Sequence, residues 1–231
     1  MDFASPDFWI AVFQIIIIDL LLSGDNAVVI ALACRNLPTH QRKLGILWGV
    51  AGAVGLRVLL TALAATLLGL PYLKLGGGAL LLWIGIKLLL PEDGEGHDIQ
   101  ASDRLVGAIK TIIVADFVMS LDNVIGVAAA AHGSLLLLLF GLAVSIPLIV
   151  FSSQLVLHLM ERFPFLVSLG AGLLGYVAGS MMVTDPALSP WLDLKTGWVA
   201  TLAGSLCAVL VILVGNGLAW RHGRKEDRTV L

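Results

Sequence analysis

The sequence predicts an all-α fold: a polytopic membrane protein with seven transmembrane helices, built as two inverted three-helix repeats plus a seventh helix. Composition is the first reason, because 58% of the 231 residues are hydrophobic and 13% are charged, whereas a soluble domain is usually about 45–50% apolar and about 25% charged. The second is an acidic motif that occurs once in each half of the chain. The third is a set of seven runs that approach the roughly 20 apolar residues a spanning helix needs. These runs lie near residues 9–33, 43–68, 74–90, 105–131, 134–157, 165–184 and 197–219.

The first run, 9–33, is predicted to stay in the protein as a helix. The segment before it, "MDFASPDFW", contains no Lys or Arg, and the run is too long for the apolar part of a cleavable signal peptide. All seven runs are continuous and rich in Leu, Ala, Ile and Val, which is typical of helices rather than of alternating strands. The glycines at 76–78, together with Gly170, Gly172 and Gly175, are expected to let neighbouring helices approach closely.

Lys and Arg are distributed unequally between the two ends of these runs, and this bias predicts the orientation. The N-terminus and the turns after 43–68, 105–131 and 165–184 contain only Lys74 and Lys195. The opposite set of ends contains Arg35, Arg42, Lys43, Arg104, Arg162, Arg221, Arg224, Lys225 and Arg228. We therefore expect the N-terminus outside and the C-terminus in the cytoplasm, with the protein in a plasma membrane, the inner membrane of a bacterium.

One connection is long and polar, the segment 91–104 with the sequence "PEDGEGHDIQASDR". It is predicted to be a cytoplasmic linker between a first three-helix repeat at 1–90 and a second, inverted repeat at 105–190. The seventh helix and a basic cytoplasmic tail, at 191–231, lie outside the repeat.

The two halves share the motif D-x3-S-x-D-N, read as "DLLLSGDN" in the first half and "DFVMSLDN" in the second. Aligned without a gap, Asp19, Ser23, Asp25 and Asn26 meet Asp116, Ser120, Asp122 and Asn123. The likeness continues into the next helix, where Trp48-Gly49 meets Phe140-Gly141. Because three helices are repeated and three is odd, the second copy must cross the membrane in the opposite sense. Inverted repeats are typical of secondary transporters, whose sites lie near the midplane.

The four aspartates of these motifs fall near the middle of predicted spans, where each would cost about 2.5–3.5 kcal/mol if it faced lipid. They must therefore face one another, water or a cation. Carboxylates, amide carbonyls and hydroxyls form an oxygen ligand set that suits hard cations such as Mn²⁺, Mg²⁺ or Ca²⁺. We predict a metal site made by Asp19, Asp25, Asn26, Asp116, Asp122 and Asn123, supported by Ser23, Ser120 and Arg57. The alternative is that the aspartates are structural and bond neighbouring helices together.

Helix geometry does not place all these residues on one face. Asp19 and Asn26 are two turns apart along one face, whereas Asp25 lies about 100° around a regular helix from Asn26. A local unwinding at Gly24 would bring Asp25 into the site. The second copy has Leu121 in place of that glycine.

Arg57 is the only basic residue well inside a predicted span. It is expected to pair with one of the four aspartates and to keep that carboxylate ionised when the site is empty. Zinc or copper would require Cys or His near the centre of the spans, and we interpret Cys34 and Cys207 as small packing residues. Met119 is expected to fill the core, with a thioether ligand to Mn²⁺ as the alternative.

The paired motifs, the seven-helix count and the segment "WGVAGAVGLR" resemble the TerC family of integral membrane proteins, in its YjbE-like branch, within the LysE transporter superfamily. The resemblance covers nearly the whole chain. It implies manganese efflux from the cytoplasm. It also places the acidic motif positions of the family on Asp19, Asp25, Asn26, Asp116, Asp122 and Asn123.

These observations together predict a divalent cation exporter that works by alternating access, with Mn²⁺ as the bound and transported ion. We expect no prosthetic cofactor, no enzymatic activity and no nucleic-acid partner. The lipid bilayer is the other expected partner. Exchange of protons for metal stays open, because clustered buried carboxylates repel one another and protonation would relieve that repulsion. Assembly into a homo-oligomer also stays open.

Three other functions are alternatives to a divalent cation exporter. The main alternative is an exporter of a small organic cation or amino acid, although four carboxylates without an aromatic cage argue against it. An intramembrane aspartyl protease would need glycine where the chain has Leu22. A retinal protein would need a lysine in the run 197–219, which contains none.

Overall fold

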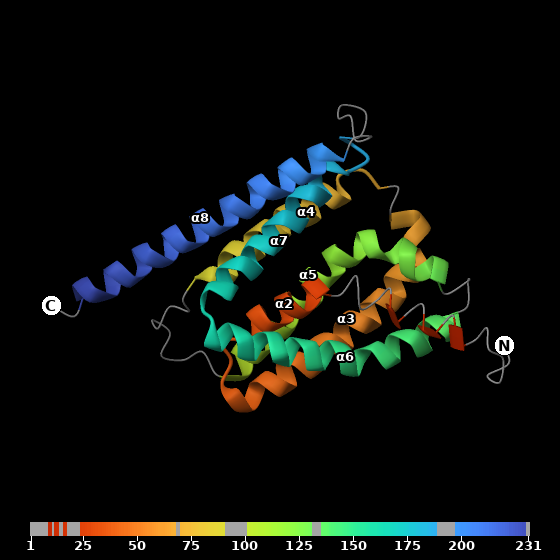
Figure 1. Ribbon diagram of the computed structural model, residues 1–231, viewed down its shortest axis with the longest axis horizontal. Coiled ribbons are helices and arrows are strands. Elements are labelled where there is room, and N and C mark those ends of the chain that lie inside the picture. The colour runs from red at the N-terminus through yellow and green to blue at the C-terminus, as the bar shows by residue number, and fades with distance from the viewer. Residues whose placement is uncertain are drawn as a thin grey trace. The chain divides into compact units, whose positions relative to one another are not determined.

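The computed structural model describes residues 9–10, 12–13, 16–17, 24–67, 70–90, 101–130, 135–188 and 197–229. Its seven long elements in these ranges are all helices, in agreement with the all-α prediction (Figure 1). They are α2 (Gly24–Cys34), α3 (Thr39–Leu67), α4 (Leu73–Leu89), α5 (Ala101–Ala130), α6 (Leu135–Arg162), α7 (Phe165–Val183) and α8 (Trp198–Thr229). Helix α5 begins inside the segment predicted as the linker 91–104, and residues 91–100 lie outside the described part of the chain.

Four segments of the described helices are long and apolar enough to cross a membrane: Thr39–Thr61 in α3, Leu139–Arg162 in α6, all of α7, and Trp198–Arg221 in α8. This is fewer than the seven spans that the sequence predicts. Helices α2 and α4 are shorter, at 11 and 17 residues, and α5 carries charged residues along its 30-residue length. Of the predicted first span, 9–33, the structure describes α2 and a few helical residues before it.

The chain folds into two compact units. Unit 1 comprises residues 1–69 and 105–157, and unit 2 comprises residues 70–104 and 158–231. Unit 1 therefore contains α2 and α3 with most of α5 and α6, whereas unit 2 contains α4, α7 and α8. Each unit draws helices from both halves of the sequence.

In unit 1, small residues of α3 allow α5 to pack closely against it. A Cβ added at Gly49 would lie 2.6 Å from the Cδ1 atom of Ile112, and one added at Gly52 would meet Ile113. Small residues let two helices approach closely, which provides the packing that holds helices together within lipid. This approach brings the buried face of α5, which includes Ile112 and Asp116, next to the middle of α3.

In unit 2, the helices α4, α7 and α8 run alongside one another (Figure 1). Leu89, Ala171 and Val211, one from each helix, form a buried apolar cluster. At Gly175 a Cβ would lie 2.7 Å from the carbonyl oxygen of Cys207, a backbone atom of α8. As expected from the sequence, glycine permits this contact, whereas Gly76 faces open space.

Asp185 ties together the ends of two helices in unit 2. It follows α7 and is fully buried. Its carboxylate accepts hydrogen bonds from the backbone N–H groups of Tyr72 (2.9 Å) and Leu75 (3.0 Å), at the start of α4, and of Ala187 (2.8 Å). The first N–H groups of a helix have no hydrogen-bond partners within the helix. Asp185 provides an acceptor for those of α4 from outside the helix. Burial alone would raise the pKa of Asp185, but these backbone donors outweigh it and lower the pKa.

Candidate functional site

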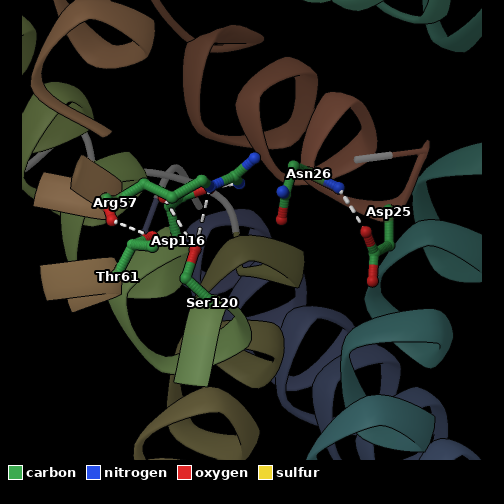
Figure 2. Close-up of polar contacts among 6 residues, drawn as sticks. All are labelled: Asp25, Asn26, Arg57, Thr61, Asp116 and Ser120. Carbon is green, nitrogen blue, oxygen red and sulfur yellow. Dashed lines mark hydrogen bonds and ion pairs between the residues drawn. The ribbon is translucent and has the colours of Figure 1, made fainter. Parts of the chain in front are cut away.

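The polar centre of unit 1 is an ion pair between Arg57 of α3 and Asp116 of α5. The Nη2 atom of Arg57 lies 2.7 Å from Oδ1 of Asp116, and the two residues are 3% and 6% exposed. Figure 2 shows the guanidinium and the carboxylate meeting between the two helices. The prediction that Arg57 pairs with one of the motif aspartates is confirmed, and the partner is Asp116.

Ser120 joins both members of the pair. It is fully buried, its hydroxyl donates to Oδ2 of Asp116 at 3.1 Å, and it accepts from Nε of Arg57 at 3.2 Å. Asp116 and Ser120 are four residues apart on α5 and therefore lie on the same face, one turn from each other. The motif spacing D-x3-S thus supplies a hydrogen bond to Oδ2 of Asp116, while Arg57 supplies the one to Oδ1.

Thr61 keeps the α3 side of this cluster tied to its own helix. Its hydroxyl donates to the backbone carbonyl of Arg57 at 2.8 Å. Such i to i−4 bonds are common for threonine within helices. The Arg57 side chain therefore reaches α5, while its backbone carbonyl accepts a hydrogen bond from Thr61 within α3.

Asn26 of α2 faces the same centre and lacks hydrogen-bond partners for its side chain. It is 4% exposed, and neither its amide oxygen nor its amide nitrogen has a partner among the described residues. A buried polar group left unpaired usually costs about 1–3 kcal/mol. Polar groups of this kind in native structures commonly mark a position for water, an ion or a ligand.

A small cavity separates Asn26 from Asp116. It has a volume of about 10 Å³, close to the roughly 10–15 Å³ needed to hold one water molecule. Its lining consists of Asn26, Val29, Ile30, Ile112 and Asp116. The two polar residues come from one motif copy each, and the remaining walls are apolar. The cavity therefore has about the size of one water molecule or one ion. The amide of Asn26 and the carboxylate of Asp116 are the polar groups in its lining.

Asp25, one of the predicted metal ligands, forms a hydrogen bond within its own helix. It lies in the first turn of α2 and is half-buried, and its Oδ1 atom accepts the backbone N–H of Asn26 at 2.9 Å. A carboxylate in the first turn of a helix is stabilised by the unpaired N–H groups there. Figure 2 draws Asp25 apart from the Arg57 cluster, with Asn26 between them.

Four of the predicted site residues are not described at the level of side chains. Asp19 and Ser23 lie outside the described residues, and only the backbone of Asp122 and Asn123 is described, within α5. Among the described residues, no three His, Cys, Asp or Glu side chains come together as a metal site. Met119 is buried, as a core residue would be, and both cysteines are free thiols. Among the predicted site residues with described side chains, Asn26, Arg57, Asp116 and Ser120 lie around the ion pair and the cavity, and Asp25 lies apart from them.

Comparison with known proteins assigns the chain to a family. A model described as "Integral membrane protein TerC family" matches residues 4–226. The chain belongs to the TerC family. It is thus an integral membrane protein, and the resemblance seen in its motifs is confirmed.

Two relatives of this TerC protein are named as membrane proteins. It is 45% identical over 207 residues to "Uncharacterized membrane protein YjbE" of Bacillus subtilis, which covers 90% of this chain and 94% of the relative. It is 26% identical over 178 residues to "UPF0053 inner membrane protein YgdQ" of Escherichia coli, covering 69% of this chain and 74% of the relative. No solved structure gives a significant match.

Asp185 is the residue that the sequence analysis did not single out. It lies in "TDPALSP", directly after a predicted span and before a proline. An aspartate followed by proline at a helix end is a signal for a turn or a cap. That signal predicts that Asp185 caps a helix end. It does not predict that the capped end is the start of α4, far away in the sequence.

Proposed function

We propose that this TerC protein exports a divalent cation, with Mn²⁺ as its cargo, by alternating access. The observation that carries the proposal is the cavity between Asn26 and Asp116, where an unpaired buried amide faces a buried carboxylate. The cation is the substrate of the protein and not a resident cofactor. The pairing of amide and carboxylate oxygens supports a hard cation as the cargo.

The charges around the cavity support a cation rather than an anion. Asp116 contributes the carboxylate at the cavity wall, and its ion-pair partner Arg57 is not among the residues that line the cavity. Buried ionisable residues within membrane segments are costly and mark ion or substrate pathways. Asp19, Asp25 and Asp122 are proposed to complete the ligand set as the cation moves through the protein.

The size of the cavity supports a single dehydrated ion. A space of about 10 Å³ is too small for an organic cation or an amino acid, and apart from Asn26 and Asp116 its lining offers no partners for water molecules that an ion retains. Mg²⁺ gives up its water reluctantly and usually keeps several water ligands in proteins. We therefore propose that dehydration favours Mn²⁺ over Mg²⁺ at this site.

The proposed orientation defines which face of the protein takes up the cation for export. We propose that the N-terminus is outside, the C-terminus is in the cytoplasm, and the two sequence repeats expose the site alternately to the two sides. The name of the relative YgdQ places that protein in an inner membrane. We propose the same location for this chain.

Isothermal titration of the purified protein in detergent tests the proposal. Mn²⁺, Mg²⁺, Ca²⁺ and Zn²⁺ are titrated into the wild type and into the variants Asp116→Asn and Asn26→Leu. The matched control is Asp103→Asn, which removes a carboxylate from the exposed first turn of the same helix, α5.

The proposal predicts Mn²⁺ binding by the wild type and by Asp103→Asn, a loss of at least about tenfold in affinity for Asp116→Asn and Asn26→Leu, and weaker binding of Mg²⁺. Wild-type protein that binds no divalent ion contradicts the proposal. Equal Mn²⁺ affinity in all four proteins contradicts the site.

A further inference from the structure

Arg57 and the proposed cargo would share one carboxylate. Oδ1 of Asp116 accepts from Arg57 and Oδ2 accepts from Ser120, while the same aspartate lines the cavity that faces Asn26. The guanidinium therefore holds the position of a counter-cation in the state that the structure shows. Its own burial, at 3% exposure, leaves it no access to bulk water.

We infer that Arg57 is a tethered counter-cation that competes with the cargo for Asp116, so that cargo binding displaces the guanidinium and the returning guanidinium helps to expel the cargo. This inference rests on the proposed function and adds a mechanism of release to it. Arg57 is a positioning residue in this scheme, because it acts on the cargo through the carboxylate of Asp116.

Electrostatic repulsion disfavours simultaneous contact of the two cations with Asp116. Like charges a few ångströms apart in a site of low effective dielectric repel strongly, and a buried carboxylate with one negative charge cannot neutralise both a guanidinium and a dication. In the empty state the pair is neutral, which avoids the cost of an isolated buried carboxylate. In the loaded state the dication takes over that neutralising role.

Ser120 contacts both groups that take part in the exchange, Arg57 and Asp116. Its hydroxyl now accepts from Nε of Arg57 and donates to Asp116. A hydroxyl has two acceptor lone pairs and rotates to suit its neighbours. Once the guanidinium withdraws, the freed lone pair of Ser120 remains beside the carboxylate as an oxygen donor for a cation.

The counter-cation is present in only one of the two sequence repeats. In the alignment that places Trp48-Gly49 on Phe140-Gly141, Arg57 falls on Ile149, a buried apolar residue of α6. The two motif copies therefore share a single arginine. Competition between an arginine and the cargo is therefore expected at Asp116, the aspartate with which Arg57 pairs.

The test compares Mn²⁺ affinity and turnover in Arg57→Gln, Arg57→Lys and the wild type. Affinity is measured by isothermal titration in detergent, and turnover is measured as Mn²⁺ uptake into proteoliposomes. Arg42→Gln is the matched control, because Arg42 is on the same helix and donates to the backbone carbonyls of Leu37 and Arg35 at the turn before α3.

The inference predicts that Arg57→Gln binds Mn²⁺ at least about tenfold more tightly than the wild type and turns over at least about tenfold more slowly. Mn²⁺ also raises the melting temperature of Arg57→Gln more than that of the wild type, since tighter binding to the folded state stabilises it further. Arg57→Lys keeps the positive charge and stays within about threefold of the wild type in affinity. Arg42→Gln leaves the affinity unchanged. A merely structural role for Arg57 would weaken Mn²⁺ binding when the residue is replaced.

Folded Arg57→Gln that binds Mn²⁺ with wild-type or weaker affinity overturns the inference, and so does Arg57→Lys with the tight binding expected of Arg57→Gln. If either result occurs while the wild type binds Mn²⁺ and Asp116→Asn does not, the counter-cation role fails and the proposed function stands. If the wild type itself binds no Mn²⁺, the proposed function fails and the inference fails with it.

Discussion

Breaking the buried ion pair on one side only is predicted to destabilise the protein more than removing both charges. The Arg57 and Asp116 side chains are 3% and 7% exposed and their nearest charged atoms are 2.7 Å apart. For charge centres about 4 Å apart, the attraction is about 4 kcal/mol at an effective dielectric constant of about 20. Asp116→Asn leaves the guanidinium buried without its counter-charge, a change that typically costs about 3–5 kcal/mol.

The double variant Arg57→Gln with Asp116→Asn leaves no buried charge at the pair and should recover most of this loss. The assay is equilibrium unfolding in mixed detergent micelles, with the free energy of unfolding measured for the wild type, both single variants and the double variant. A coupling is expected because the two side chains are in direct contact, and the cycle isolates it when each single variant removes the interaction without adding a new one. We expect a coupling of at least about 1.5 kcal/mol, and a coupling of zero within error would refute the role of the pair. Asp103→Asn, on the exposed start of α5, is the control and should change the stability little.

Three further predictions concern other parts of the structure. Gly175→Ala should lower the melting temperature markedly, because the new methyl group would meet backbone atoms of α8, whereas Gly76→Ala, which faces open space, should leave it unchanged; equal melting temperatures would refute the packing. The pKa of Asp185 is lowered in the folded state, so its contribution to stability is present at pH values above the ordinary aspartate pKa of about 4 and is lost as the pH falls through the lowered value. Asp185→Asn should therefore be less stable than the wild type at pH 7, and the difference should shrink at acid pH; a difference independent of pH would contradict this. Asn26→Ala should leave the thermal stability near that of the wild type, because the lost amide has no hydrogen-bond partner among the described residues, while Mn²⁺ affinity falls; a large loss of stability would show that the amide is structural.

The sequence predicts the helices of this protein well because their signals are local. Continuous apolar runs and glycines that permit close packing are readable from single segments, and Gly175 behaves as expected in the structure. The lengths of the elements are harder to predict. Helix α5 begins at Ala101, inside the polar segment taken as a linker, because a polar segment that precedes a span can form the first turns of its helix.

The candidate site was predictable in its residue types and only partly in its contacts. A buried arginine in a membrane span must have a negative partner, so the pairing of Arg57 with a motif aspartate followed from energetics. The choice of Asp116 among four aspartates depends on how α3 and α5 pack, which no local pattern specifies. Asp25 shows the same limit, because its position in the motif predicts a site residue, while its hydrogen bond to the backbone N–H of Asn26 depends on the local geometry at the start of α2.

Transport of Mn²⁺ by inside-out membrane vesicles tests the central claim most directly. Vesicles that contain the wild type, Asp116→Asn or the control Asp103→Asn are given radiolabelled Mn²⁺ outside, on the side that corresponds to the cytoplasm. The account predicts accumulation of Mn²⁺ by the wild type and by Asp103→Asn, and none above empty vesicles for Asp116→Asn at equal protein levels. Accumulation by Asp116→Asn at the wild-type rate, or none by the wild type, would contradict it.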